Sequence, residues 1–347
     1  MCRRTIASLL ALVICCMASP SFGQDPMFSQ FYSAPLQLNA AFAGTSFAPR
    51  IALNYRNQWP NHNAPANAYV TYAASYEQAV ERLNSGFGIL LLSDAAGDGI
   101  LKTNQASMAY SYRVRIKRDV GLKFGIDAGI TQVALDWNRL IFLDQIDPIN
   151  GPTDPAGNPY PTQEQRPDEL SKNWFDIGAG MLLYTPRFYI GLSAKHLTTP
   201  DQTFLDINDN LITGLPIRLS LHAGSELKFK TGNKRHWAAF VSPNVLLLRQ
   251  GSFTQINAGA YVGYGPVFVG GWYRHTLTNL DAVIALIGFQ KGILKMGYSF
   301  DITLSQLTLQ GSGGAHELSL MINIDQSEAI RQRRKANRYN DCFNMFR

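Results

Sequence analysis

Residues 119–135 carry the pattern that most limits how this chain can fold. They read D-V-G-L-K-F-G-I-D-A-G-I-T-Q-V-A-L, and every even position from Val120 to Ile130 is apolar, whereas the odd positions hold charged residues, glycine or threonine. Because side chains alternate faces along a β-strand, this pattern predicts a strand with one apolar face and one polar or empty face. The segment exceeds an ordinary strand of about 5–6 residues and fits the roughly 9–11 residues, plus overhang, of a strand that crosses a bilayer at a tilt.

The same alternation recurs along most of the chain, and we predict about fourteen strands from residue 50 onward. In the ninth strand the pattern is interrupted by Pro243. Because proline cannot donate a ladder hydrogen bond, we expect a bulge or an early end of the strand there. The predicted strands are 50–59, 68–79, 86–94, 101–116, 119–135, 173–184, 188–197, 217–229, 236–248, 252–264, 267–275, 281–290, 292–304 and 314–325.

The connections between these strands are sorted by length. Those after even-numbered strands are mostly tight, whereas residues 136–172, 198–216 and 305–313, all after odd-numbered strands, form extended loops; the short 249–251 connection is an exception. Outer-membrane barrels have short periplasmic turns and longer outer loops, and a Greek-key sandwich would not sort its loops in this way. We therefore predict an all-β, transmembrane antiparallel outer-membrane β-barrel, with both termini of the chain on the periplasmic side.

The N-terminal residues have the layout of a secretory signal peptide. Arg3 and Arg4 precede a short apolar run, and Ser21 and Gly23 supply small residues for cleavage before Gln24. We predict a signal peptide over 1–23 and an exported protein in the outer membrane. Removal of this segment would leave Cys342 as the single cysteine, so no internal disulfide is expected.

The positive charge is concentrated at the two ends of the chain. Of the net charge of +6, Arg3 and Arg4 contribute +2 and residues 326–347 contribute +4, which leaves a neutral body. A basic tail on a neutral body does not indicate a nucleic-acid groove. No apolar run approaches the ~20 residues of a membrane helix.

We find no sequence pattern for catalysis, a metal or a cofactor. The histidines are scattered, and Asp206, Asn208 and Asn210 form only an incomplete calcium loop, because Leu211 stands where glycine is expected. We therefore predict no enzyme activity and no cofactor. Acidic side chains on the polar strand faces are expected to line the lumen, and some of them are expected to pair there with basic ones. The acidic set is Asp119, Asp127, Asp176, Glu226, Asp301 and Glu317, and the basic set is Arg113, Arg115, Lys123, Arg218, Lys228 and Lys295.

Aromatic side chains lie toward many strand ends, as in the girdles of membrane barrels. The predicted girdle residues are Tyr55, Trp59, Tyr69, Tyr110, Trp174, Tyr184, Tyr264 and Trp272.

The start of the predicted mature chain resembles the opening signature of the PorP/SprF family, outer-membrane proteins of the Bacteroidetes type IX secretion and gliding machinery. The matching residues are Gln24-Asp25-Pro26-Met27-Phe28-Ser29-Gln30-Phe31-Tyr32, Pro35-Leu36 and Asn39-Ala40-Ala41-Phe42-Ala43-Gly44-Thr45. The end, Asp341-Cys342-Phe343, also resembles the family. Ala40 and Phe343 depart from it, since proline is usual at both positions.

The resemblance implies a non-enzymatic role in export or surface attachment of cargo proteins that carry a type IX sorting domain. It implies as partners this cargo, periplasmic and outer-membrane subunits of the machine, and outer-membrane lipid, with no nucleic acid. A small-molecule channel or transporter is the alternative. Lumen glycines such as Gly125 and Gly180 would leave open space in a channel and would serve close packing in the first hypothesis.

The predicted organisation is a signal peptide at 1–23, an irregular lead segment at 24–49 that plugs or braces the barrel, the barrel at 50–325 and a basic periplasmic tail at 326–347. The loop 136–172 is the expected cargo site. The signature residues expected in the plug are Asp25, Pro26, Phe28, Ser29, Gln30, Phe31, Asn39, Phe42 and Gly44. The tail residues expected to bind a periplasmic partner, by charge and by apolar anchors, are Arg333, Arg334, Lys335, Cys342, Phe343 and Phe346.

Overall fold

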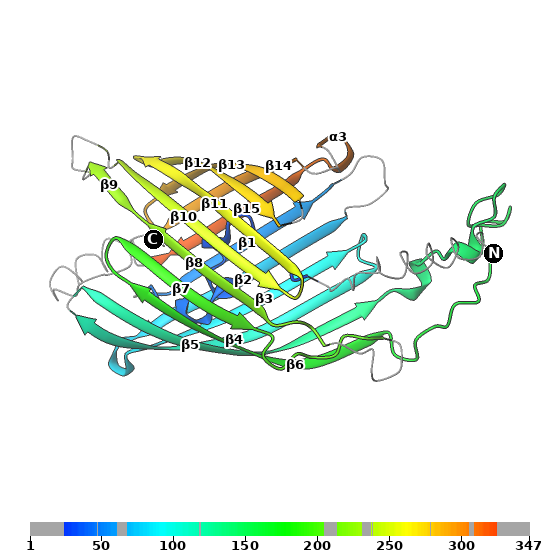
Figure 1. Cartoon of the computed structure of the whole chain (residues 1–347), viewed down its shortest axis with the longest axis horizontal. Helices are drawn as coiled ribbons and strands as arrows, with labels where there is room; N and C mark the ends of the chain where they lie inside the picture. Colours follow the sequence, from blue (N-terminus) through cyan, green and yellow to red (C-terminus); the bar gives the residue numbers. More distant parts are fainter. Residues whose placement is uncertain are drawn as a thin grey trace, which may run out of the picture.

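The protein is a closed antiparallel β-barrel (Figure 1). The computed structural model describes residues 24–46, 48–60, 68–117, 119–204, 214–230, 237, 239–277, 279–304 and 309–324. Neighbouring strands pair in chain order, and β1 pairs with β15 along its whole length, from Arg50 opposite Asn323 to Gln58 opposite Ala315. This pairing of the first and last strands closes the sheet into a barrel, as a membrane-spanning sheet requires.

The strand bounds follow the predicted strands to within a few residues. They are β1 Arg50–Gln58, β2 Tyr69–Val80, β3 Ser85–Ala96, β4 Leu101–Lys117, β5 Val120–Leu135, β6 Ser171–Tyr184, β7 Phe188–Lys195, β8 Arg218–Ser225, β9 Leu227–Lys230, β10 Ala239–Gln250, β11 Phe253–Tyr264, β12 Val267–Thr276, β13 Asn279–Lys291, β14 Leu294–Thr303 and β15 Ala315–Asn323. Both β8 and β9 pair with β10 and occupy one position in the wall, so the barrel has 14 strand positions. The predicted outer-membrane barrel of about fourteen strands is thus confirmed.

The interruption predicted at Pro243 lies in the neighbouring strand. β10 runs through Pro243, which is paired with Ala260 of β11. On the other side of β10, β8 pairs from Gly224 and β9 pairs from Leu227, so the break between them lies opposite Pro243. Because proline offers no N–H, the partner strand loses its ladder bond there, and β10 itself is held by β11.

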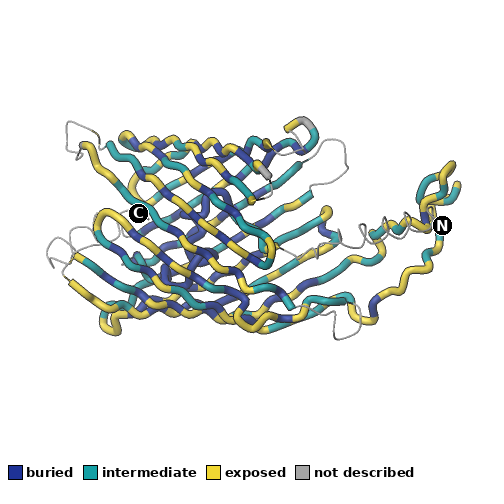
Figure 2. The backbone as a smooth tube through the Cα atoms, in the orientation of Figure 1, coloured by how far each residue is buried: buried dark blue, intermediate teal, exposed yellow. Residues whose placement is uncertain are grey.

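Buried and exposed residues alternate along the strands (Figure 2). In β5 the outward Ile126 and Ile130 are 59 % and 60 % exposed, whereas the inward Lys123 and Asp127 are buried. This arrangement, apolar outside and polar inside, is that of a barrel whose outer wall faces lipid. No helix in the described part of the chain is long and apolar enough to span a membrane.

The predicted aromatic girdle is correct only in part. Tyr110 and Tyr264 are exposed on the outer wall. Tyr69 is also exposed, but its place in the alternation of β2 is an inward one at the long-loop rim. Tyr184 and Trp272 instead face the lumen and are 6 % and 3 % exposed, because their positions in the strand alternation are inward ones.

The helices are single turns that lie in the lead segment and the connections. Those of the lead segment are η1 Phe31–Ser33, α2 Pro35–Leu38 and η2 Ala40–Phe42. The connections contain η3 Glu81–Leu83, η4 Trp137–Arg139, η5 Leu143–Gln145 and α3 Leu309–Ser312.

The lead segment runs back through the barrel, which corrects the expected position of the N-terminal end. Arg50 and Asn323 are paired at the rim that carries the short turns, as the even strand count requires. From there the chain passes up the lumen, and Asp25 lies beside Gln250 and Arg218, at the rim that carries the long loops. Residue 24, the predicted mature start, is therefore at the opposite rim from the C-terminal end of the barrel.

Candidate functional site

The lumen segment, residues 25–46, packs its apolar side chains against the inner wall. Phe28, Phe31 and Phe42 are at most 2 % exposed and belong to one apolar cluster that also includes wall residues. Tyr32 stacks on Trp272 of β12, with ring centroids 5.6 Å apart. Burial of large aromatic side chains is strongly favourable, so this contact fixes a short, irregular segment that forms little regular structure of its own.

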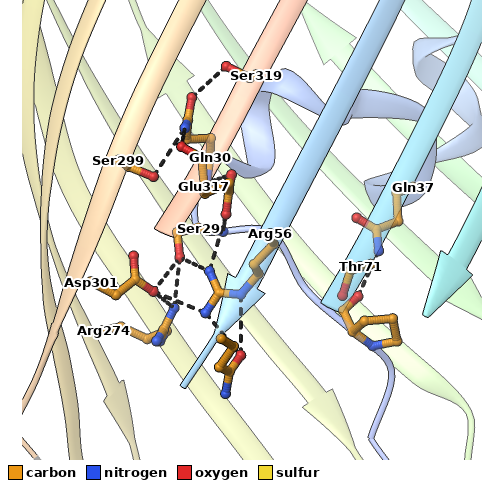
Figure 3. Close-up of polar contacts among 12 residues, drawn as sticks. Ser29, Gln30, Gln37, Arg56, Thr71, Arg274, Ser299, Asp301, Glu317 and Ser319 are labelled. Atoms are coloured by element: carbon orange, nitrogen blue, oxygen red, sulfur yellow. Dashed lines mark hydrogen bonds and ion pairs between the residues drawn. The ribbon is translucent and has the colours of Figure 1, made fainter. Parts of the chain in front are cut away.

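Ser29 lies at the centre of a buried ionic cluster near the long-loop rim (Figure 3). Its Oγ donates to Asp301 at 2.6 Å and accepts from Arg56 at 2.5 Å and Arg274 at 2.9 Å. Arg56 also pairs with Asp301 at 3.0 Å and with Glu317 at 3.1 Å. Arg274 pairs with Asp301 and also with Asp281, so the two arginines are surrounded by three carboxylates. Removal of one partner would leave an uncompensated charge in a buried site, at a loss of about 3–5 kcal/mol.

Glu317 also recognises the backbone of the lumen segment. Its two carboxylate oxygens accept from the Ser29 and Gln30 N–H groups at 2.7 and 2.9 Å. The Gln30 side chain donates to Ser299 at 3.1 Å and accepts from Ser319 at 2.7 Å, so it bridges β14 and β15 (Figure 3). A turn of the segment is thus held by a charged acceptor on its N–H groups and by a polar wall on its side chain.

Wall cations and hydroxyls bind the backbone carbonyls further along the segment. Lys195 donates to Leu36 O at 3.3 Å, Arg218 to Gln37 O at 2.9 Å and Ser193 to Leu38 O at 2.7 Å. Lys123 and Ser111 both donate to Ala43 O, at 2.5 and 2.7 Å. Because the segment forms few backbone bonds of its own, these contacts satisfy carbonyls that would otherwise be buried without a partner.

Asn39 forms side-chain hydrogen bonds both within the lumen segment and to the wall of the barrel. Its Oδ1 accepts from Ala41 N at 2.8 Å and begins η2, while its Nδ2 donates to Met181 O at 3.2 Å and Leu192 O at 3.0 Å. The side chain therefore shapes the segment and fixes it to β6 and β7 at once.

Wall glycines form the sockets into which the segment fits. A Cβ added at Gly125 would lie 2.2 Å from Ala41 N, and one at Gly180 would lie 1.9 Å from Asn39 Oδ1. In β3, a Cβ added at Gly86 would lie 2.2 Å from Ala43 O. These glycines allow close packing of the wall on the lumen segment and do not leave open space, which is the arrangement expected for a plugged or braced barrel.

A second polar cluster holds the first residues of the segment at the long-loop rim. Asp25 Oδ2 pairs with Arg218 at 2.7 Å and with His196 Nε2 at 2.6 Å, and His196 Nδ1 contacts Asp176 at 2.5 Å. Burial favours the neutral form of Asp25, but Arg218 and His196 outweigh it and hold the pKa of this carboxyl well below its usual range. Burial lowers the pKa of His196, and the bonds to Asp176 and Asp25 outweigh it, so this pKa is raised above 6.5.

The structure places the nine signature residues along one continuous path inside the barrel. Asp25, Ser29, Gln30 and Asn39 make the polar contacts described above, and the phenylalanines are buried. Pro26 O accepts from Gln37 Nε2 at 2.7 Å, and Gly44 approaches Gly86 with a positive φ of 62°. The predicted tail residues Arg333, Arg334, Lys335, Cys342, Phe343 and Phe346, and the predicted signal peptide, lie outside the described residues.

One of the predicted pairings of the lumen carboxylates is present among the described residues, that of Glu226 with Lys228 at 3.1 Å. Asp127 instead pairs with Lys195, Asp176 with His196, and Asp301 and Glu317 with Arg56. Asp119 is exposed. Sequence reasoning missed Arg56, Lys195 and Arg274, although their inward places in the alternation were a usable signal.

Residues 136–170, named here the long-loop arm, extend well beyond the barrel (Figure 1). Arg139 pairs with Asp98 of the β3–β4 connection at 2.7 Å, and Gln145 donates to Tyr160 O at 2.5 Å. Asp144 accepts from Gln163 N at 2.6 Å, a bond that lowers its pKa. The arm thus has an internal hydrogen-bond framework, and on it Leu143 and Ile149 are 90 % and 91 % exposed.

No group of three or more histidine, cysteine or acidic side chains suited to a metal ion occurs within the described ranges. The contacts that the structure shows are those of docking, in which the wall binds a peptide segment through its backbone and its aromatic side chains.

A valine at Gly125 is expected to unseat the lumen segment, because its Cβ would overlap Ala41 N. Overpacking of this kind is destabilising by about 1–3 kcal/mol. We expect Gly125→Val to raise the ion conductance of the protein in planar bilayers. The matched control is Gly271→Val on the outer wall, where an added Cβ meets only Ile284 O at 3.8 Å. Equal conductance in the two variants would contradict the expectation.

The Asp25–His196 contact is expected to depend on pH. The folded-state pKa of His196 is raised above its ordinary value of 6.5, so the protonated imidazole stabilises the folded protein. This stabilisation is complete below pH 6.5 and is lost as the pH rises through the folded-state pKa. The folded-state pKa of Asp25 is lowered below its ordinary value of 3.8, so the stabilisation from its ionised carboxyl is present above pH 3.8. A spin label at Gln24→Cys, in a Cys342→Ser background, should therefore gain mobility as the pH rises above 6.5.

Arg218 still holds Asp25 at alkaline pH, so the expected loosening is partial. In His196→Gln the label should have, at every pH, the partly increased mobility that the unmodified protein reaches at alkaline pH. A mobility profile that is the same with and without the imidazole would show that His196 does not control this contact.

The chain matches the family model described as "Type IX secretion system membrane protein PorP/SprF" over residues 21–322. None of the curated proteins compared with it matches. Among solved structures it is similar to the Acinetobacter baumannii outer membrane protein Omp33, with a TM-score of 0.43 and 4 % identity over 81 % of this chain and 99 % of the other. It is also similar to the CymD monoaromatic hydrocarbon channel, with a TM-score of 0.43 and 12 % identity over 86 % and 94 %.

A FadL homologue from Pseudomonas aeruginosa has a TM-score of 0.38 and 11 % identity over 80 % and 90 % of the two chains. These distant likenesses carry no argument about function, whereas the family model covers most of the chain. The protein, an outer-membrane β-barrel with a polar lumen occupied by its own N-terminal segment, belongs to the PorP/SprF family of type IX secretion system membrane proteins.

Proposed function

We propose that this protein is a non-enzymatic outer-membrane component that supports export or surface attachment of cargo proteins with a type IX sorting domain. Membership of the PorP/SprF family supports the link to the secretion system. The observation that carries the proposal is the long-loop arm, which presents Leu143 and Ile149 to solvent at 90 % and 91 % exposure. Large apolar side chains held out by an ordered loop are typical of a protein-binding surface.

The filled lumen favours an anchoring role over a conducting one. Phe28, Phe31 and Phe42 of the lumen segment are buried, and the ionic cluster around Ser29 fixes the segment to β1, β12, β14 and β15. A small-molecule channel is the alternative function. It would require the segment to leave its sockets at Gly125 and Gly180.

The basic tail is a second proposed contact. Residues 326–347 follow the last strand at the short-turn rim, where outer-membrane barrels face the periplasm. We assign to Arg333, Arg334 and Lys335 the steering of a periplasmic subunit of the machine, and to Cys342, Phe343 and Phe346 its anchoring.

Polar substitution of the arm should weaken cargo recovery. We expect Leu143→Asn with Ile149→Asn to reduce recovery of sorting-domain proteins by about tenfold, the effect of losing about 1.4 kcal/mol of contact. The measurement is affinity purification from outer membranes in mild detergent, with mass spectrometry of the recovered proteins. Leu83→Asn is the matched control, because Leu83 is 59 % exposed at the short-turn rim.

Retention of the sorting-domain protein by the arm variant would contradict this site. Recovery of the unmodified barrel without any such protein, together with steady ion conductance, would favour the channel.

A further inference from the structure

The outer wall of the barrel contains a hollow of about 720 Å³ that spans β15 and β1 to β5. Its floor is one register row of outward side chains in which Ala74 and Ala106 alternate with larger residues. The row consists of Leu320, Leu53, Ala74, Leu91, Ala106 and Ile130. Small side chains between leucine and isoleucine leave the depression, and its surroundings are apolar.

The next row toward the long-loop rim has a different chemistry. It consists of Tyr55, Tyr72, Ser93, Asn104 and Gln132, which are neighbours in the strand register. Ser93 Oγ donates to Asn104 Oδ1 at 2.8 Å, and the Gln132 amide has no hydrogen-bond partner within the described part of the chain. Amide groups on a lipid-facing wall are unfavourable unless something hydrogen-bonds to them.

The depth of this polar row follows from β5. The outward side chains Leu122, Phe124, Ile126, Ala128 and Ile130 precede Gln132. A tilted strand crosses the apolar band in roughly 9–11 residues, so Gln132 lies where the wall leaves the hydrocarbon and enters the headgroup region. One row further, Lys102 is exposed between Ala95 and Ala134.

We propose that this hollow binds an acylated, phosphorylated glycolipid of the outer leaflet, of the lipid A class. The apolar row takes an acyl chain, the hydroxyl and amide row bonds the sugar headgroup, and Lys102 faces a phosphate. From the membrane midplane outward, the apolar row, the hydroxyl and amide row and Lys102 follow the same order as the acyl chains, the sugar and the phosphate of such a lipid. A long-loop position places the site in the outer leaflet.

The test is native mass spectrometry of the full barrel in mild detergent with added lipid A. The unmodified protein should retain one lipid, and Ala106→Phe, which fills the hollow, should reduce retention by about tenfold, as when about two methylene groups lose their burial. Gln132→Leu and Lys102→Gln test the headgroup contacts and should also weaken retention. Ala128→Phe is the matched control, because Ala128 is exposed on β5 outside the hollow.

All variants change outward residues, and heat-modifiable migration on gels reports whether each barrel is folded. Unchanged retention in a folded Ala106→Phe barrel would overturn the site, as would an equal loss in Ala128→Phe. Retention of phosphatidylethanolamine as strong as that of lipid A would overturn the assignment of the headgroup. Failure of the unmodified barrel to retain any lipid, with a protein subunit shielding Ala106 instead, would overturn the proposal.

Discussion

The polar inner face of the closed wall is the constraint on which the rest of the structure depends. A barrel that faces lipid must turn its charged strand positions inward, and the buried groups there need partners. The lumen segment supplies many of them, since Lys123, Ser193 and Lys195 all donate to its backbone carbonyls. The wall therefore recognises the segment mainly as a peptide, and its aromatic side chains add the apolar contact.

The strands could be predicted from sequence because their outer face has to meet a single requirement, that its side chains be apolar. Lipid demands apolar side chains at every second position, so the period of two is clean in β5 and β8 without reference to any other part of the chain. The Pro243 break was assigned to the wrong strand for a related reason. Pro243 lacks the N–H that would bond to the neighbouring strand. The interruption therefore falls in that neighbour, between β8 and β9, and not in β10 itself.

The lumen contacts could not be predicted in the same way. Ser29 and Glu317 meet across 288 positions of sequence, and Asp25 and Arg218 across 193. Such pairs depend on the register of every strand between them and on the path of a segment without a periodic pattern. The signature residues marked the segment as special through family resemblance, but the identity of Arg56 and Arg274 as its partners required the closed barrel.

The ionic cluster around Ser29 also couples two steps of assembly. Arg56 lies on β1 and Glu317 on β15, the two strands whose pairing closes the barrel, and Ser29 binds both sides of that seam. Before closure these charges lack part of their compensation, and after closure the segment at Ser29 has wall on every side. Seating of the segment and pairing of β1 with β15 therefore stabilise each other. A lumen segment added after closure would have to enter sockets, such as that at Gly125, that fit it with no spare room.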